Sequence, residues 1–410
     1  MKRLFVIFIL ISTLSFSQTK FKAGVWRGVL TLSEKRNELI LPFNFNVRYM
    51  GEFLSIDILN AEEKITVTEI AGDSVNFKMP VFDSEFRTVL KNDTLRGLWI
   101  NNAKKEKNKI PFEAYYNDKA RFATSAKVKS DFTGRYEVTF NPKKEDEYKS
   151  IGIFKQVGNK ITGTFLTETG DYRYLEGSVQ NNNMTMSCFD GAHAFLFFAN
   201  SGKKTGKADS LEGKVFYGTS GSEDWVAVRN EKFKLKDPEG ITTLKNPNEK
   251  VSFSFPNLEK QTVTLNDAKF NDKVVVIQIM GSWCPNCMDE SAYLAGVYKK
   301  FNAKGLEVVA LAYERTDDFE KSQKNLTRLK TRYKIDYEIL ITGLTGKAKA
   351  SESLSFLNSV SAFPTTIILD RKHNVKSIYT GFSGPATGKE YENYKAKTES
   401  LLTQLLLKKN

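Results

Sequence analysis

Short runs of alternating apolar and polar residues dominate the first half of the chain. Examples lie at 66–70, 151–154 and 160–165, and turns rich in Gly, Asn and Asp separate such runs. A period of two puts the apolar side chains on one face of a strand, and short runs joined by turns are typical of antiparallel sheets. The pattern therefore predicts two antiparallel β-rich units, at 21–116 and 130–230.

The two units also resemble each other in sequence. Residues 24–26 (Gly-Val-Trp) parallel 134–136 (Gly-Arg-Tyr), and residues 93–97 (Asp-Thr-Leu-Arg-Gly) parallel 209–213 (Asp-Ser-Leu-Glu-Gly). The offset between matching positions changes only by the length of a loop. Similarity at a nearly constant offset is what an internal repeat leaves in a sequence. We therefore expect a duplicated β unit.

The pattern changes after a charged linker at 231–250 that contains Pro and Gly. Three almost unbroken apolar runs follow, at 274–280, 306–312 and 365–369. A strand that is apolar on both faces is buried on both faces, so helices must cover the sheet. Four segments are helical candidates: 285–304, 317–333, 347–357 and 388–408. Alternating strands and helices predict an α/β domain over 251–408.

The first residues follow neither pattern. Lys2 and Arg3 precede an apolar run at 4–14 that is too short to span a bilayer as a helix, and small residues follow it. This order predicts a cleaved signal peptide over 1–17, with a buried strand or a short anchor as the alternatives. The predicted cleavage site has no Cys, so the sequence gives no support for a lipid anchor. Since no later stretch of 18 or more apolar residues occurs, we expect a soluble protein exported to the periplasm.

The chain is basic, with a formal net charge of +13. The surplus is spread in short Lys-rich runs interleaved with acids, such as Lys104–Lys107. Nucleic-acid binding needs a basic face together with a recognition motif. The sequence contains no such motif, so we expect no nucleic-acid partner and interpret the charge as a solvated surface.

The 410 residues contain only three cysteines, too few for a disulfide scaffold. Cys284 and Cys287 form a C-x-x-C motif. Three roles are open to such a pair: a stable disulfide bridge, half of a metal site, or a redox couple. The other candidate zinc ligands, Cys188, His193 and His373, have no paired spacing. A structural bridge would close too short a loop to add much stability. The motif therefore favours a redox couple without a bound metal, and the isolated Cys188 reads as a buried small apolar residue.

The position of the motif favours reactivity. Cys284 follows a predicted buried strand that ends in Gly281-Ser282, and Pro285 fits the first turn of the next helix. Free backbone N–H groups at a helix start stabilise a thiolate, which is the form that attacks a disulfide. Cys287 lies about one turn later on the same side, near enough to resolve a mixed disulfide.

Residues 281–287 (Gly-Ser-Trp-Cys-Pro-Asn-Cys) resemble the W-C-x-x-C site of the thioredoxin superfamily, specifically the TlpA/ResA-like thiol–disulfide oxidoreductases. Other stretches agree with that family: a hairpin at 255–265, a Pro-Thr-Thr strand at 363–370 and a glycine-rich turn at 381–388. Glu290 stands where ResA-like members carry an acid near the site. The resemblance covers about residues 251–408 and implies a thioredoxin-like domain.

The resemblance implies that Cys284 is the nucleophile and Cys287 the resolving thiol. It implies a cis bond before Pro364, which would face the redox pair and leave Phe363, Pro364 and Thr365 free to bind a substrate polypeptide. Trp283 is expected to cover one side of the disulfide.

Two alternatives remain open for Glu290, a proton relay to the resolving thiol or an ordinary acid in the first turn of a helix. The chain departs from the thioredoxin pattern at Gln278, where many members carry a buried Asp. An amide cannot accept a proton, so Glu290 is the leading candidate for acid–base help. The intervening Pro285-Asn286 lacks the His of strong oxidases, which favours a reductant or an isomerase.

The sequence therefore predicts a periplasmic disulfide reductase without a cofactor. The expected partners are exported proteins with disulfides, with apocytochromes among the candidates, and a membrane thiol relay as electron donor. One alternative is a peroxiredoxin-like peroxidase, although the P-x-x-x-T-x-x-C setting of that family is absent. Another alternative is an envelope ligand-binding module in which the β region acts and the redox domain is accessory.

Overall fold

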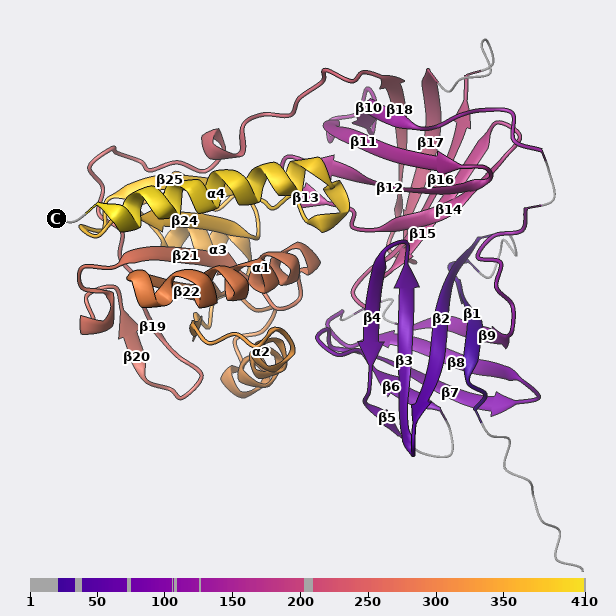
Figure 1. The fold of residues 1–410 in the computed structure, drawn as a ribbon, viewed down its shortest axis with the longest axis horizontal. Helices are drawn as coiled ribbons and strands as arrows, with labels where there is room; N and C mark the ends of the chain where they lie inside the picture. Colours follow the sequence, from indigo (N-terminus) through magenta and orange to yellow (C-terminus); the bar gives the residue numbers. More distant parts are fainter. Residues whose placement is uncertain are drawn as a thin grey trace, which may run out of the picture.

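The computed structural model describes residues 21–33, 39–71, 75–104, 106, 109–124, 127–202 and 209–408. The predicted signal peptide at 1–17 lies outside the described residues. Figure 1 shows two strand-rich bodies, one above the other, beside a body that combines strands and helices. None of the helices in the described part of the chain has the length and hydrophobicity of a membrane span.

The first sheet is antiparallel and has the order β4-β3-β2-β1-β9-β8-β7-β6-β5. Its first strand pairs with both the second and the last strand. Alternate residues of these strands point inward and form an aromatic core that includes Trp26, Phe43 and Phe112. The strands are β1 (Gly24–Thr31), β2 (Ile40–Met50), β3 (Phe53–Asn60), β4 (Glu63–Val67), β5 (Ile70–Ala71), β6 (Asn76–Lys78), β7 (Ser84–Lys91), β8 (Thr94–Asn101) and β9 (Lys109–Tyr116).

The second sheet has the order β11-β10-β18-β17-β16-β15-β14-β12-β13, and β11 also pairs with β12, so the sheet closes on itself. Here too the first strand pairs with the second and the last. The prediction of antiparallel sheets before residue 230 is confirmed. The strands are β10 (Gly134–Phe140), β11 (Tyr148–Val157), β12 (Lys160–Thr167), β13 (Gly170–Asp171), β14 (Leu175–Gln180), β15 (Asn183–Phe189), β16 (Ala194–Ser201), β17 (Ser210–Tyr217) and β18 (Ser222–Arg229).

The two sheets share part of their cores. Phe189, at the end of β15, belongs to the core of the first sheet and stacks on Phe43 with ring centroids 4.6 Å apart. Arg121, in the connection between the sheets, is buried and donates to the carbonyl of Leu59 and to the hydroxyl of Ser187. Buried contacts of this kind fix the position of one sheet on the other.

The C-terminal region contains a five-stranded sheet of order β23-β22-β21-β24-β25, in which β21, β22 and β23 are parallel, β24 is antiparallel to β21, and β25 is antiparallel to β24. The three apolar runs form β21 (Val274–Met280), β22 (Leu306–Ala312) and β24 (Thr365–Leu369). Every residue of β21 is buried. The other strands are β19 (Ser254–Pro256), β20 (Thr262–Thr264), β23 (Glu338–Ile341) and β25 (Val375–Thr380).

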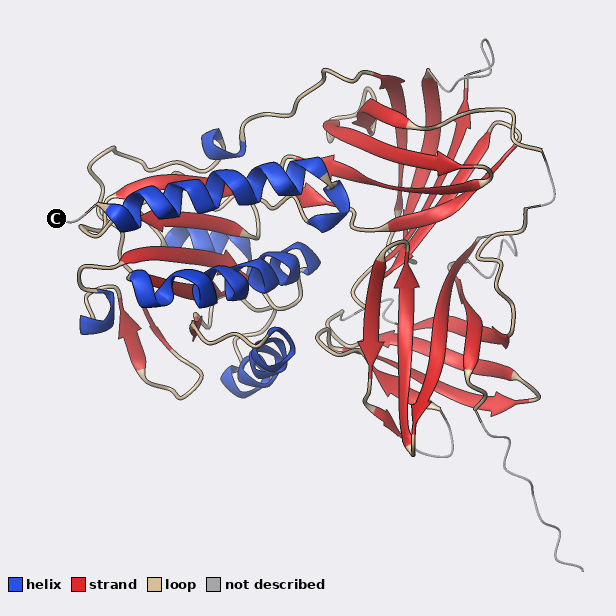
Figure 2. Cartoon of the chain, viewed as in Figure 1, coloured by secondary structure: helices blue, strands red, loops and turns tan. Residues whose placement is uncertain are grey.

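Helices cover this sheet (Figure 2). In Figure 1, α1 and α4 lie in front of the sheet and α3 lies behind it. The helices are α1 (Pro285–Phe301), α2 (Phe319–Tyr333), α3 (Gly346–Ser353) and α4 (Lys389–Leu407). The segment predicted helical to residue 357 ends earlier, at Ser353, because the following residues enter the core and Leu357 forms a bridge with Leu244.

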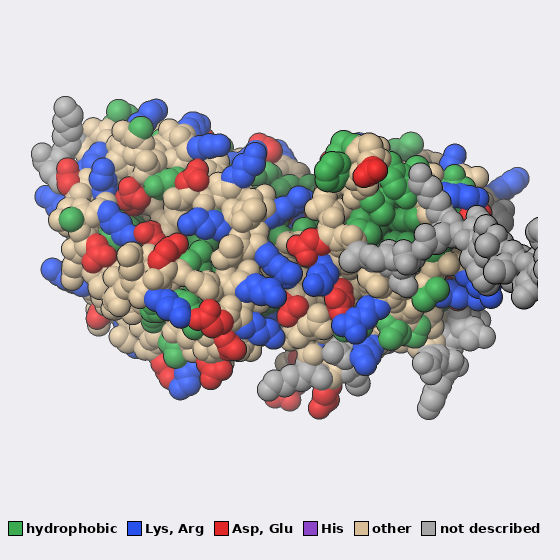
Figure 3. All heavy atoms as spheres, turned by 90° about the horizontal axis from the view of Figure 1, so that it is seen from below, with side chains coloured by type: hydrophobic (Ala, Val, Ile, Leu, Met, Phe, Trp, Pro, Cys, Tyr) green, Lys and Arg blue, Asp and Glu red, His purple; other side chains and the backbone are tan. Residues whose placement is uncertain are grey.

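Charged side chains of both signs are interspersed over the C-terminal domain on the face seen in Figure 3, at the left. Many lie in exposed ion pairs such as Lys260 with Glu320 and Lys300 with Glu399. Pairs of this kind contribute about 0–1 kcal/mol each, so they affect solubility more than stability.

Candidate active site

The two cysteines of the motif lie at the start of α1, directly after β21. Cys284 is the N-cap residue of α1, and the backbone N–H of Cys287 donates to its sulfur at 3.3 Å. Cys284 is 8% exposed and Cys287 is fully buried. Both are free thiols in this structure. The arrangement leaves one narrowly accessible sulfur, held by the first turn of a helix, with a second sulfur behind it.

The predicted substrate segment lies beside the first sulfur. The Phe363–Pro364 peptide bond is cis. The carbonyl oxygen of Phe363 accepts a hydrogen bond from the Cys284 thiol, with an S···O distance of 3.5 Å. Thr365, fully buried, begins β24 next to β21. This juxtaposition places the backbone before β24 against the thiol.

Trp283, the residue before Cys284, packs against Phe363. Its indole N–H donates to the carbonyl of Tyr313 at 3.0 Å, and its ring meets the ring of Phe363 edge to face, with centroids 5.7 Å apart. The hydrogen bond fixes the plane of the indole, because the donor can reach that carbonyl in one orientation only. Trp283 therefore forms a wall next to Cys284.

Glu290 is fully buried, and it lies beyond the first turn of α1. The reading of Glu290 as an ordinary first-turn acid is therefore wrong. Its carboxylate accepts hydrogen bonds from Thr366 (2.7 Å), Gln278 (2.9 Å) and Tyr394 (3.3 Å). Burial raises the pKa of Glu290 to about 7, although the three hydrogen bonds act in the opposite direction.

Gln278 connects this carboxylate to the redox pair. Its amide N–H₂ donates to Glu290 and lies 3.5 Å from the carbonyl oxygen of Cys287, while its carbonyl accepts from the hydroxyl of Ser291 at 3.2 Å. The amide cannot exchange protons, but it holds the carboxylate in place. Where many thioredoxins carry a buried Asp, this chain thus has an amide, that of Gln278, which orients the carboxylate of Glu290.

The thiol of Cys287 resists ionisation. Burial raises the pKa of Cys287 well above the usual range of a thiol, and the hydrogen bond and charge of Cys284 and the charge of Glu290 raise it further. At neutral pH Cys287 is therefore protonated. A nearby base must take its proton before it can attack.

The sequence comparisons agree with this geometry. A model of the AhpC/TSA family matches residues 247–378. The thiol-disulfide oxidoreductase ResA of Bacillus anthracis is 29% identical over 149 residues, which are 36% of this chain and 76% of ResA. The thioredoxin-like protein YneN of Bacillus subtilis is 29% identical over 129 residues, 32% of this chain and 68% of YneN.

The C-terminal region is a ResA/TlpA-like domain of the thioredoxin superfamily. The chain is accordingly an oxidoreductase. Among solved structures, a DsbF homologue from Corynebacterium diphtheriae is 22% identical, covers 41% of this chain and 98% of its own, and has a TM-score of 0.31. A thiol-disulfide oxidoreductase from Bacteroides fragilis is 15% identical, with 37% and 97% coverage and a TM-score of 0.29.

Sequence reasoning missed two charged residues of the ResA/TlpA-like domain. The buried carboxylate of Glu314 accepts from the N–H (2.7 Å) and the hydroxyl (2.6 Å) of Ser282. The guanidinium of Arg315 lies 4.4 Å from the Trp283 ring centroid. Burial lowers the pKa of Arg315, whereas the charges of Cys284 and Glu314 raise it. Both residues follow β22, and carboxyl ends of neighbouring parallel strands share an edge of the sheet, so this signal could have identified them.

The second β sheet also contacts the ResA/TlpA-like domain at the redox motif. The side-chain amide of Asn286 pairs with the backbone of Asp171, accepting from its N–H at 2.6 Å and donating to its carbonyl at 3.2 Å. The carboxylate of Asp171 accepts from the N–H of Gly384 at 2.6 Å. The segment 167–173 therefore lies against Asn286, one of the two residues between the cysteines. Nothing in the sequence signals this contact.

Arg173 joins all three bodies through a set of carboxylates that we call the Arg173 cluster. Its guanidinium pairs with Asp289 of α1 (2.6 Å), with Asp190 after β15 (3.7 Å) and with Glu63 of β4. It also donates to the carbonyl of Pro285 at 3.0 Å. Burial alone would lower the pKa of Arg173, but the three carboxylates hold it well above its usual range. The cluster is a buried ionic contact at the start of the helix that carries the cysteines.

Cys188 takes no part in this site. It is fully buried in the core of the second sheet, and burial raises its pKa well above the usual range. The interpretation of Cys188 as a small core residue is confirmed. Within the described ranges, no three His, Cys, Asp or Glu side chains are arranged to hold a metal ion.

Proposed function

We propose that the protein is a periplasmic thiol–disulfide reductase whose redox pair is Cys284 and Cys287. The observation that carries the proposal is the placement of two free thiols in the first turn of α1, one just accessible and one buried. The likeness to ResA supports the thiol–disulfide chemistry.

In the first step, the thiolate of Cys284 attacks one sulfur of a substrate disulfide. The substrate S–S bond breaks, a mixed disulfide with Cys284 forms, and the other substrate sulfur leaves as a thiolate that takes up a proton. The N–H of Cys287 already donates to the attacking sulfur and stabilises its negative charge. The substrate backbone approaches along Phe363–Thr365, next to the wall formed by Trp283.

In the second step, Cys287 loses its proton, attacks Cys284 and releases the remaining substrate sulfur. Two electrons have then passed from the protein dithiol to the substrate, and the protein holds a Cys284–Cys287 disulfide. Glu290 is the base in this proposal because its pKa of about 7 leaves it partly ionised at neutral pH, and its charge acts on Cys287. A dithiol donor, which we assign to a membrane thiol relay, reduces the protein again.

The proposal also includes the organisation of the chain. A signal peptide at 1–17 directs export, a duplicated β unit at 21–116 and 130–230 follows, and a linker at 231–250 leads to the redox domain at 251–408. Support for the duplication comes from topology, since in each sheet the first strand pairs with the second and the last. The clients are exported proteins with disulfides, with apocytochromes as one class.

A trapping experiment tests the proposal. In a Cys287→Ser variant expressed in the native envelope, the mixed disulfide cannot be resolved, so client proteins should accumulate as adducts on Cys284. Mass spectrometry of non-reduced adducts identifies both clients and donor. The matched control is the Cys284→Ser variant, which keeps Cys287 and Cys188 and should form no adducts. Equal adduct formation by both variants, or unchanged disulfide reduction by Cys284→Ser, would refute the assignment.

A further inference from the structure

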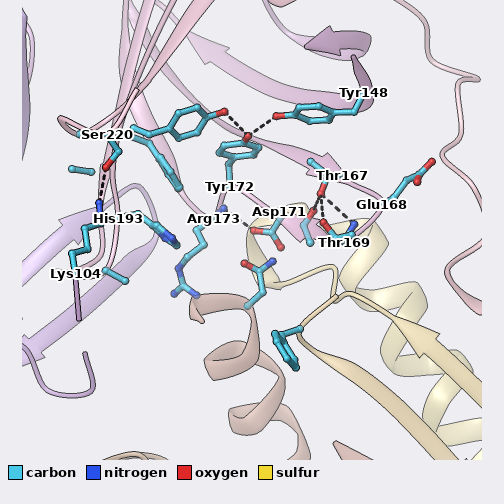
Figure 4. A pocket seen from close by; sticks show the side chains of 18 of the residues that line it. Lys104, Tyr148, Thr167, Glu168, Thr169, Asp171, Tyr172, Arg173, His193 and Ser220 are labelled. Carbon is cyan, nitrogen blue, oxygen red and sulfur yellow. Dashed lines mark hydrogen bonds between the residues drawn. The ribbon is translucent and has the colours of Figure 1, made fainter. Parts of the chain in front are cut away.

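A large cavity lies where the two β sheets meet the redox domain. Its volume is about 870 Å³, within the range of protein ligand sites. The β region contributes several aromatic side chains to the lining, beside charged and polar ones: Trp99, Tyr148, Tyr172, Phe195 and Tyr217. The redox domain contributes Asn286 and Phe363. Figure 4 shows Tyr148, Tyr172 and His193 on one side of this space and the start of α1 on the other.

The cavity adjoins the nucleophilic sulfur. Phe363 belongs to its lining, and the carbonyl of the same residue lies 3.5 Å from the sulfur of Cys284. Asn286, on the other side, is two residues beyond Cys284 in the same helical turn. A substrate disulfide that reaches Cys284 therefore places its flanking residues at the entrance of this cavity.

The chemistry of the lining favours an apolar occupant. The hydroxyl of Tyr172 is bonded to those of Tyr148 (3.0 Å) and Tyr217 (2.9 Å), and Glu223 accepts from the latter two. The hydroxyls are thus engaged with one another, which leaves the ring surfaces for a ligand (Figure 4). Lys104, also in the lining, donates to the hydroxyl of Ser220 at 2.8 Å.

Two polar side-chain atoms of residues in the lining have no hydrogen-bond partner within the part of the chain that the structure describes, the indole N–H of Trp99 and Nε of Arg173, and the latter lies 3.7 Å from the Asp190 carboxylate. Trp99 is 3% exposed, and its buried indole N–H has no acceptor among the described residues. An unsatisfied buried donor costs about 1–3 kcal/mol. An apolar side chain that enters the cavity would meet the aromatic rings.

We propose that this cavity binds the polypeptide segment that flanks the substrate cysteine, and that it selects a bulky apolar side chain, such as Phe, next to that cysteine. The site deepens the proposed function and rests on it. The aromatic rings bury the side chain, and the substrate sulfur then lies at Cys284.

The test uses the full-length reduced protein and three disulfides: a peptide dimer with Phe beside its cysteine, the same dimer with Ser in that place, and hydroxyethyl disulfide. Ser220→Trp fills the rim of the cavity from an exposed position. Ser222→Trp is the matched control, because Ser222 is exposed two residues away and does not line the cavity. The measured quantity is kcat/KM for each disulfide.

The wild type and Ser222→Trp should reduce the Phe peptide about tenfold faster than the Ser peptide, since burial of one aromatic side chain supplies at least that factor. Ser220→Trp should lose this preference and reduce hydroxyethyl disulfide at the rate of the wild type. The absence of a preference in the wild type, or its persistence in Ser220→Trp, would overturn the cavity assignment. A wild type that reduces none of the three disulfides would instead overturn the proposed function.

Discussion

Replacing Glu290 with Gln tests whether a buried carboxyl group stores a proton next to the redox pair. In the folded protein its pKa is raised from 4.5 to about 7, chiefly by burial. Below pH 4.5 the group is protonated in both the folded and the unfolded chain. Between pH 4.5 and 7 it ionises first in the unfolded chain, so a rise in pH through this window stabilises the unfolded state. Above pH 7 the effect is complete.

The size of the effect follows from the shift. One pKa unit corresponds to 1.36 kcal/mol, so Glu290 lowers the free energy of unfolding by about 3 kcal/mol across this window. Glu290→Gln removes the titration. The substitution also replaces one acceptor oxygen by an N–H₂ group, which faces the hydroxyls of Thr366 and Tyr394 when the remaining oxygen accepts from Gln278. This exchange shifts the whole curve and leaves the pH dependence as the readout.

Urea unfolding of the reduced wild type and variant at several pH values between 4 and 8 measures this difference. The stability advantage of the wild type over Glu290→Gln should shrink by about 3 kcal/mol from the lowest to the highest pH. Glu320→Gln, on an exposed part of α2, is the matched control, and its difference from the wild type should vary with pH much less than that of Glu290→Gln. A difference between wild type and Glu290→Gln that stays constant with pH would refute the reasoning.

The same variant has a kinetic consequence. If Glu290 accepts the proton of Cys287, the resolution step slows by about a hundredfold at pH 7 in Glu290→Gln, and mixed disulfide with Cys284 accumulates. Resolution by the wild type should also become faster as the pH rises through about 7. Rapid acid quench and mass spectrometry report the fraction of mixed disulfide. Unaltered resolution would leave Glu290 with a structural role only.

Two further predictions concern the contact between the β region and the redox domain. Arg173→Met leaves the carboxylates of the Arg173 cluster without their cation and should cost about 3–5 kcal/mol of stability in urea unfolding, whereas Arg96→Met, with a side chain that is 70% exposed, should cost under about 1 kcal/mol. Gly381→Ala places a Cβ 2.7 Å from the backbone of Thr169, so limited proteolysis should separate the β region faster than in Gly343→Ala, which has a similar positive φ and no atom within 4 Å of the new Cβ. If Arg173→Met cost no more stability than Arg96→Met, or if Gly381→Ala were cleaved no faster than Gly343→Ala, the contact between the β region and the redox domain would not have the stabilising role assigned to it.

The strands of the redox domain were predictable because their burial leaves a direct trace in the sequence. β21 is buried on both faces, so its apolar run is continuous and its bounds can be read directly. The start of α1 was predictable for a local reason, since Pro285 suits a first helical turn and Cys284 caps it. Such features depend on neighbours in the sequence.

The environment of Glu290 was only partly predictable. Its position six residues after Cys284 marked it as a candidate, but burial and its partners decide its pKa. Those partners are Gln278 of β21, Thr366 of β24 and Tyr394 of α4. They come together only when the sheet and the last helix pack on α1. The sequence showed the loss of a carboxylate at residue 278 but not that the amide holds the remaining one.

The Arg173 cluster could not be predicted, because its members lie in three separate parts of the chain. Glu63, Arg173 and Asp289 each read alone as ordinary surface residues. Their buried contact exists only because the loop before β14 reaches both β4 and α1. Pairing across such distances leaves no periodic signal in a single sequence.

The position of the β region argues against a merely tethering role. Its loop at 167–173 bonds to Asn286, and Arg173 bonds to the carbonyl of Pro285, so both residues between the redox cysteines are engaged by another part of the chain. Cys284 itself keeps only 8% of its surface exposed. A distant tether would leave the start of α1 open to any disulfide. We infer that a substrate must pass the β region to reach Cys284, and that selection and chemistry therefore occur in one place.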